Sequence, residues 1–114
     1  MDGYLIDRSD GRTDGEDWTE NFEELPGGAG ISIIVESTSQ QGVGPRLHRH
    51  PYAETFLIRR GSATFIIGAT QVEAHAGQVL VAPAGVAHKF RTGASGYEAV
   101  HIHASVRFVT EWLE

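Results

Sequence analysis

The sequence GVGPRLHRHPYAETFLIRRG, residues 42–61, contains three side chains of the types that bind metal ions: His48, His50 and Glu54. Alternate residues of a β-strand share one face, so His48 and His50 point the same way, about 7 Å apart in extended backbone. Both imidazoles can then reach one ion at about 2.1 Å. The break at residues 51–53 lets the chain turn and bring the Glu54 carboxylate beside them.

His88, further along the chain, is a fourth candidate ligand. Three imidazoles and a carboxylate suit borderline divalent transition metals, and this donor set excludes none of Fe, Mn, Ni, Co, Cu or Zn. Four protein ligands in an octahedral shell leave two adjacent positions open, which is typical of a metal that binds a further ligand. We therefore expect a divalent transition metal as the cofactor.

The composition describes a small protein with one hydrophobic core. A chain of 114 residues suits a single domain. It has no Cys, which excludes disulfides and thiolate metal sites and is consistent with a reducing cytoplasm. No apolar run approaches the roughly 18 residues that span a bilayer, and the N-terminus does not resemble a signal peptide. We expect a cytoplasmic protein with no membrane partner.

The net charge of −6 belongs mainly to the first part of the chain. Most acidic residues lie within residues 1–29, where Arg8 and Arg12 are the only basic ones. The absence of a Lys/Arg cluster argues against nucleic-acid binding. Segment 26–30, rich in Pro and Gly, marks a boundary. We interpret residues 1–29 as an acidic, solubilising arm and residues 30–114 as a single domain.

Short strands and turns follow from residue 30, which indicates an all-β antiparallel barrel or two-sheet sandwich. In the arm, residues 4–6 could add a short strand, and the spacing of Trp18 and Phe22 suggests a helical turn or a docked segment. We expect a hairpin at Gly61-Ser62 and a turn at residues 92–96. The expected strands are 31–37, 47–50, 54–60, 63–67, 71–74, 79–82, 87–91 and 97–105.

Residues 106–114 predict a short C-terminal helix. Ser105 can cap its start. Such a helix would cover one end of the barrel or be exchanged across a dimer interface. The prediction rests on an apolar stripe at helical spacing, formed by Phe108, Val109, Trp112 and Leu113.

The opening stretch resembles the first signature of the cupin superfamily: Gly, five residues, His-x-His, three or four residues, Glu, six residues, Gly. Gly42, His48, His50, Glu54 and Gly61 satisfy every position. The second cupin signature is Gly, five residues, Pro-x-Gly, two residues, His, three residues, Asn. It is matched by Gly77, Pro83, Gly85 and His88, with Thr92 in place of the Asn. So many fixed positions at fixed spacing are a specific signal.

This resemblance implies an antiparallel jelly-roll β-barrel, usually dimeric, with a metal held by His48, His50, Glu54 and His88 near one mouth. Cupins include dioxygenases, isomerases, decarboxylases, storage proteins and ligand-sensing modules, so the family constrains the fold more than the chemistry. We expect a homodimeric, single-domain cupin that acts on or binds a small polar organic molecule, with dioxygenase- or isomerase-like chemistry. The alternative is a non-catalytic ligand-binding or sensing cupin with a structural metal.

Glu54, Arg46, His101 and His103 are the candidates for catalysis. Glu54 or a nearby His could take a proton from the substrate. Arg46 has the strand parity of the His-x-His pair, so it could bind a substrate carboxylate or enolate oxygen. The alternatives for Arg46 are an internal salt bridge or exposure to solvent, and these are favoured because parity is easily lost near a strand end.

His101 and His103 share one face of the last expected strand with Tyr97. If that face turns inward, either His could act as a general base or as a hydrogen-bond donor to a ligand of the metal. If it turns outward, both are exposed barrel residues, and the sequence leaves the two alternatives open. His75 is expected to be exposed, and Phe56, Ile58, Phe65 and Phe90 to line the apolar interior.

Overall fold

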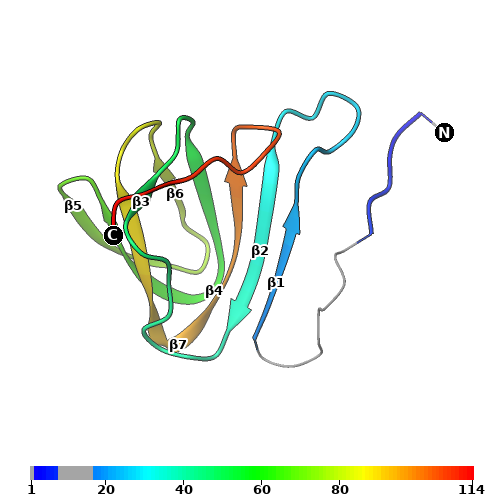
Figure 1. Ribbon diagram of the computed structural model, residues 1–114. Coiled ribbons are helices and arrows are strands. Elements are labelled where there is room, and N and C mark those ends of the chain that lie inside the picture. The colour runs from blue at the N-terminus through cyan, green and yellow to red at the C-terminus, as the bar shows by residue number, and fades with distance from the viewer. Residues whose placement is uncertain (1, 8–16) are drawn as a thin grey trace.

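The computed structural model describes residues 2–7 and 17–114. The strands, all within residues 18–112, form one curled antiparallel 8-stranded sheet (Figure 1). No described residue is helical, so no helix of the described chain is long and apolar enough to cross a membrane. The strands are β1 Trp18–Phe22, β2 Ser32–Thr38, β3 His48–Arg49, β4 Glu54–Ile67, β5 Thr70–His75, β6 Val79–Ala82, β7 His88–His103 and β8 Glu111–Trp112.

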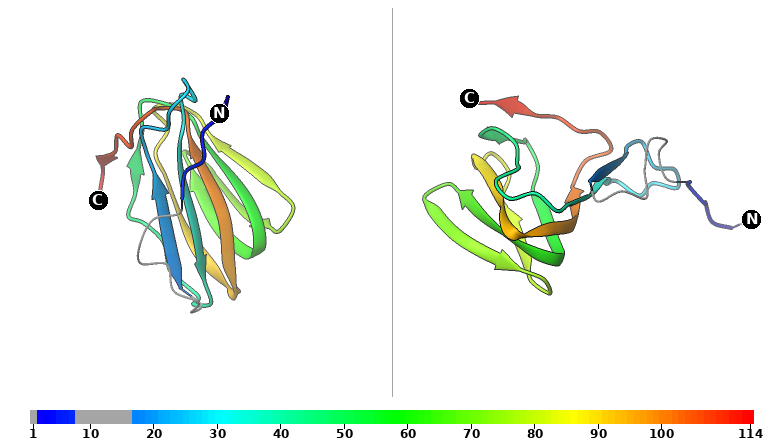
Figure 2. Two further views of the ribbon diagram at one scale, coloured as in Figure 1. Left: turned by 90° about the vertical axis from the view of Figure 1, so that its right-hand side faces the viewer. Right: turned by 90° about the horizontal axis from the view of Figure 1, so that it is seen from below.

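The two longest strands, β4 and β7, pair along most of their length and form the spine of the sheet. One path through the sheet has the order β1-β2-β7-β3-β8, and β4 also pairs with β5 and β6. The expected barrel is therefore present as an antiparallel half-barrel. Figure 2 shows the sheet curling around an open concave face, with β1 and β2 extending to one side.

The core lies on the concave side of β4 and β7. Alternate residues of both strands are buried, as a period of two requires. The predicted interior residues Phe56, Ile58, Phe65 and Phe90 are confirmed as core, and Tyr97 packs with them.

Two predicted turns are wrong because glycines bend long strands here instead of ending them. Strand β4 runs through Gly61-Ser62, and β7 runs through residues 92–96. The β4–β7 register shifts near Gly61, which is the mark of a β-bulge. Gly61 and Gly96 both have positive φ, +73° and +80°. A bulge uses the same glycine chemistry as a turn, so the sequence pattern does not separate them.

The predicted C-terminal helix is also wrong. The tail is extended, and β8 pairs antiparallel with β3, placing Trp112 opposite His48. The Leu113 N–H donates to the Leu47 carbonyl at 2.9 Å. The Arg49 guanidinium contacts the Glu111 carboxylate at 2.7 and 3.0 Å. The tail thereby gives the free backbone edge of β3 a partner, which a helix could not do.

The N-terminal segment docks on the sheet as a strand, so of the two alternatives the docked segment is confirmed and the helical turn is wrong. Strand β1 pairs antiparallel along β2, with Trp18 opposite Ser37 and Phe22 opposite Ile33. Residues 4–6 form no strand. Arg8 and Arg12, the two basic residues of the predicted acidic arm, lie outside the described residues. The boundary of that arm at residue 29 stays a prediction.

Replacing Gly61 with Ala should destabilise the sheet strongly. A Cβ at Gly61 would lie 1.9 Å from the Gly96 carbonyl oxygen, in addition to the cost of positive φ. We expect a loss of about 3 kcal/mol or more in the free energy of unfolding, measured by urea denaturation. Gly28→Ala is the matched control, because Gly28 has φ +72° and nothing within 4 Å. Equal losses in the two variants would contradict the bulge argument.

Candidate metal centre

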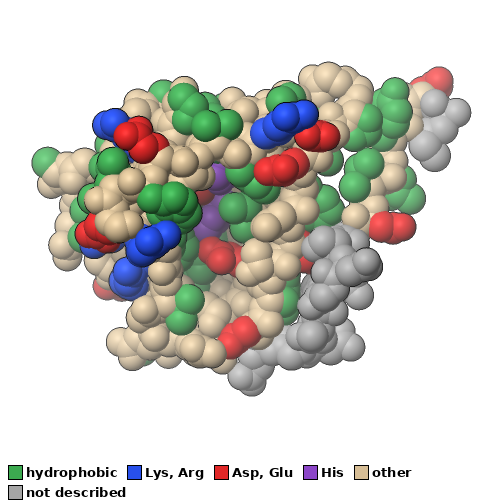
Figure 3. Space-filling view, in the orientation of Figure 1, with side chains coloured by type: hydrophobic (Ala, Val, Ile, Leu, Met, Phe, Trp, Pro, Cys, Tyr) green, Lys and Arg blue, Asp and Glu red, His purple; other side chains and the backbone are tan. Residues whose placement is uncertain are grey.

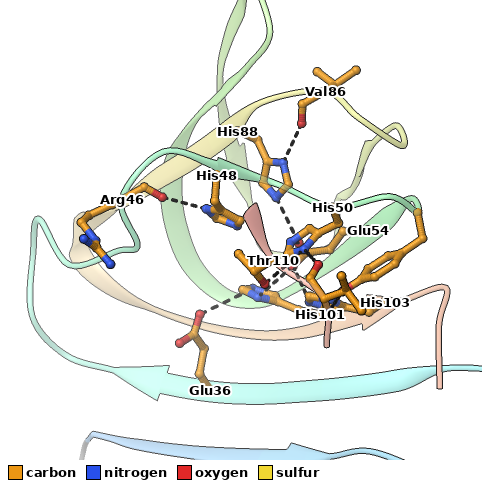
Figure 4. Close-up of polar contacts among 12 residues, drawn as sticks. Glu36, Arg46, His48, His50, Glu54, Val86, His88, His101, His103 and Thr110 are labelled. Carbon is orange, nitrogen blue, oxygen red and sulfur yellow. Dashed lines mark hydrogen bonds and ion pairs between the residues drawn. The ribbon is translucent and has the colours of Figure 1, made fainter. Parts of the chain in front are cut away.

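Four buried side chains converge where β3, β4 and β7 begin. His48 and His50 lie at β3 and just after it, Glu54 opens β4, and His88 opens β7 opposite His48. One ligand atom from each lies within 4.8 Å of the others. Figure 4 shows the side chains directed toward a common point. The structure therefore brings together the four residues that the sequence proposed as ligands.

Backbone carbonyls fix the orientation and tautomer of all three imidazoles. A carbonyl can only accept a hydrogen bond, so each Nδ1 must carry its proton. In the neutral ring, Nε2 then presents a lone pair, which is the state that a metal requires. The three bonds are His48 Nδ1 to Arg46 O at 2.7 Å, His50 Nδ1 to Val109 O at 2.7 Å and His88 Nδ1 to Val86 O at 3.0 Å.

The Glu54 carboxylate faces these lone pairs. Its Oε1 atom lies 3.0 Å from both His50 Nε2 and His88 Nε2. Burial would raise the pKa of Glu54, but the neighbouring imidazoles, His103 foremost, outweigh burial and hold that pKa well below its usual range. The carboxylate is therefore ionised and accepts only, so a proton or a cation must lie between acceptors this close.

A proton between Glu54 and an imidazole nitrogen accounts for only one of the two short contacts. Burial lowers the pKa of His88, but the hydrogen bonds to Glu54 and Val86 outweigh burial and raise it. His50 Nε2 is buried and forms no hydrogen bond with any described atom, despite its short distance to Glu54. Three directed nitrogen lone pairs and one carboxylate oxygen around a common point fit a divalent transition metal.

His101 and His103 turn inward, which settles the alternative that the sequence left open. Both are 3% exposed. The second carboxylate oxygen of Glu54 lies 3.2 Å from His103 Nε2 and 3.7 Å from His101 Nδ1. Burial lowers the pKa of His101 to about 4, so this ring is neutral near pH 7. Glu54 thus has one oxygen among the candidate ligands and the other toward a second pair of imidazoles.

Two tyrosines that the sequence analysis did not select as functional hold this second pair. The Tyr97 hydroxyl is 2.8 Å from His101 Nε2, and the Tyr52 hydroxyl is 2.6 Å from His103 Nδ1. Tyr52 also accepts the Val109 N–H at 3.1 Å, which ties the C-terminal tail to the site. Tyr97 could have been found, because it shares the strand parity of both imidazoles.

Glu36 is a further residue that sequence reasoning missed. It lies on β2, and its Oε1 is 3.6 Å from His101 Nε2. Burial, together with the negative charge of Glu54, raises the pKa of Glu36 from 4.5 to about 7. In the sequence, Glu36 is the single carboxylate within the β-branched run of residues 31–37. A strand assignment alone does not distinguish such a carboxylate from one on the protein surface.

Arg46 lies apart from the cluster. Its side chain is exposed, and its guanidinium carbon lies 4.8 Å from the centre of the Trp112 ring. Figure 4 shows the guanidinium directed away from the His and Glu side chains. Its contribution to the centre is the backbone carbonyl that accepts from His48. His75 is exposed, as expected.

A cavity of about 840 Å³ opens onto the cluster from the concave face. It is bounded by β1, β2, the segment before β3 and the C-terminal tail, in addition to the candidate ligands. Figure 3 shows His side chains at the bottom of a hollow that hydrophobic side chains border. A small organic molecule could therefore approach the four candidate ligands.

The sequence profile of the Cupin domain matches residues 34–104, well over half of the chain. The chain therefore belongs to the cupin family. A search of curated proteins finds no significant match.

The solved structures similar to this one include the oxalate decarboxylase of Bacillus subtilis at pH 4.6. It has a TM-score of 0.77 and 20% identity over 90% of this chain and 29% of that chain. The same enzyme, in a structure from work on its Mn(II) centres, gives the same values. At this identity the likeness concerns the fold, and this chain spans less than a third of the enzyme's length.

Glu36 should make the stability of the metal-free protein fall as the pH rises. Below about pH 4.5 the carboxyl is protonated in both the folded and the unfolded state, so it has no effect. Between 4.5 and about 7 the unfolded state ionises more readily, and folding becomes less favourable. Glu36→Gln removes this penalty. It should therefore gain on the order of 1–2 kcal/mol relative to wild type between pH 5 and pH 8.

Urea denaturation of the metal-free proteins at the two pH values measures this difference. Glu98→Gln on β7 is the control, because Glu98 is outside the cavity lining. The change between the two pH values should be larger for Glu36→Gln than for this control. A Glu36→Gln difference that does not change with pH would contradict the effect of burial on Glu36.

Proposed function

We propose that this cupin binds one divalent transition metal through His48, His50, Glu54 and His88, and uses it to bind and act on a small polar organic molecule. The candidate metals are Fe, Mn, Ni, Co, Cu and Zn. The observation that carries the proposal is the set of Nδ1–carbonyl hydrogen bonds, which direct three Nε2 lone pairs and Glu54 Oε1 toward one point. An apolar core or a surface cluster of His would not require this common orientation.

A bound metal of this kind would supply Lewis-acid polarisation of substrate oxygens and, if redox-active, dioxygen chemistry. The chain's own residues supply the remaining functions. Glu54 would bind with one oxygen, while the other faces His103 Nε2 and His101 Nδ1 at 3.2 and 3.7 Å. His101 lines the cavity and is neutral near pH 7, so it could orient a substrate or relay a proton there. The cavity that opens onto the four candidate ligands supports dioxygenase- or isomerase-like chemistry over a purely structural metal.

Metal uptake tests the proposal directly. Purified wild-type protein incubated with Mn(II), Co(II) or Zn(II) and then desalted should retain about one ion per chain, measured by elemental analysis. His48→Ala should reduce retention at least about tenfold, because it removes a ligand. His75→Ala is the control, since His75 is exposed and distant in sequence from the cluster. Unchanged retention in His48→Ala would refute the assignment of the ligands.

Turnover separates the enzyme from the alternative, a ligand-binding or sensing cupin. Oxygen uptake or isomerisation by the metal-loaded protein should depend on both the metal and His101. His101→Phe should therefore retain the metal and lose at least about tenfold in rate. Metal-loaded protein that binds ligands without turnover would favour the alternative.

The homodimer and the cytoplasmic location stay predictions from the sequence. Gel filtration of the purified protein tests the first. A monomer at micromolar concentration would contradict it.

A further inference from the structure

The charged side chains that line the cavity are all acidic. They are Asp17, Glu36 and Glu54, and no described Lys or Arg belongs to the lining. Asp17 is exposed, and its two oxygens accept hydrogen bonds from the Ser39 N–H at 3.0 Å and the Gln40 side chain at 2.6 Å. Glu36 also lines the cavity and lies closer to the candidate metal centre, with its Oε1 atom 3.6 Å from His101 Nε2.

The position of Glu36 follows from the register of the sheet. It lies opposite Ala99 on β7, a small residue that leaves room above the strand. Its side chain is 28% exposed, and the exposed part faces the cavity. Figure 4 shows Glu36 rising from β2 toward His101. Any molecule that fills the space between β2 and the cluster must contact this carboxylate.

Most of the surface that lines the cavity is apolar. A ligand with an apolar or aromatic body would gain free energy from these walls, and aromatic rings offer faces for stacking. The large apolar side chains of the lining are Trp18, Ile34, Phe56, Phe90, Phe108 and Trp112.

The balance of charge limits what can bind at the centre. A divalent ion and the single Glu54 carboxylate leave one net positive charge. A neutral chelating ligand leaves the centre positive, and a singly anionic one brings it to neutrality. A dianion makes it negative beside Glu36, and the two like charges repel each other. The nearby cation Arg46 is exposed and lies over the Trp112 ring, so it does not offset this charge.

We propose that the ligand of this site is a neutral or singly anionic molecule that chelates through two oxygen atoms and carries an apolar or aromatic body, as a β-diketone does, and that Glu36 excludes dicarboxylates. This inference rests on the proposed metal-binding function. It separates the ligand class of this chain from oxalate, the substrate in the name of the enzymes whose fold it shares.

Calorimetric titration of Co(II)-loaded protein with benzoylacetone, acetylacetone and oxalate at pH 8.5, where Glu36 is ionised, tests the inference. Metal content is measured before and after each titration, so that removal of the ion by a chelator is detected. Wild type should bind benzoylacetone more tightly than acetylacetone, because the phenyl group meets the apolar walls. It should bind oxalate most weakly of the three.

Variants then test the role of Glu36. Glu36→Gln should tighten oxalate binding about tenfold while changing the affinity for benzoylacetone less than about twofold. Glu98→Gln, outside the cavity lining, should change neither. Glu36→Ala provides a second measurement should the Gln variant fold poorly.

Three results would overturn the inference. In the first, oxalate binds wild type as tightly as benzoylacetone. In the second, Glu36→Gln leaves the ratio of the two affinities unchanged. In the third, Arg46→Ala weakens oxalate binding, which would make Arg46 the partner of the anion. Protein that retains no Co(II) before titration would instead refute the proposed function, and this inference with it. The metal analysis distinguishes the two failures.

Discussion

The ionised Glu54 carboxylate, buried among imidazoles, is the constraint on which the rest of the site depends. Each of its oxygens faces a different pair of rings, so neither can be moved without leaving a charge unpaired. The elements that supply these rings come from distant parts of the chain, because His50 follows β3 while His103 ends β7. The geometry of the site therefore forms only when the sheet has closed and brought these distant segments together.

The sequence was sufficient for the fold class and the four candidate ligands because both depend on local regularities. Strand parity placed His48 and His50 on one face, and the spacing around Glu54 and His88 carried the family resemblance. The same parity put Tyr97 beside His101. Parity alone does not reveal which face is concave, and for this reason the burial of His101 and His103 emerged only from the pairing of β7 with β2 and β4.

The errors share a physical origin, which is that long-range pairing overrode local pattern. Residues 106–114 have a helical apolar stripe, yet the edge of β3 pairs with Glu111–Trp112 as a strand. Gly61 and residues 92–96 carry turn chemistry, yet cross-strand pairing of β4 with β7 absorbs them as bends. Glu36 was missed because its importance comes from what lies across the concave face, and no local signal records that.

The bond between His50 and the carbonyl of Val109 has a consequence for how the end of the chain behaves. When the last residues detach, the imidazole loses the acceptor that fixes its proton, and the ring becomes free to exchange tautomers and rotate. If the centre binds an ion as proposed, tail docking and ion retention would be thermodynamically linked, and by reciprocity whatever favours one would favour the other. The C-terminus of this cupin would act as a latch, sensitive to whether the centre is occupied.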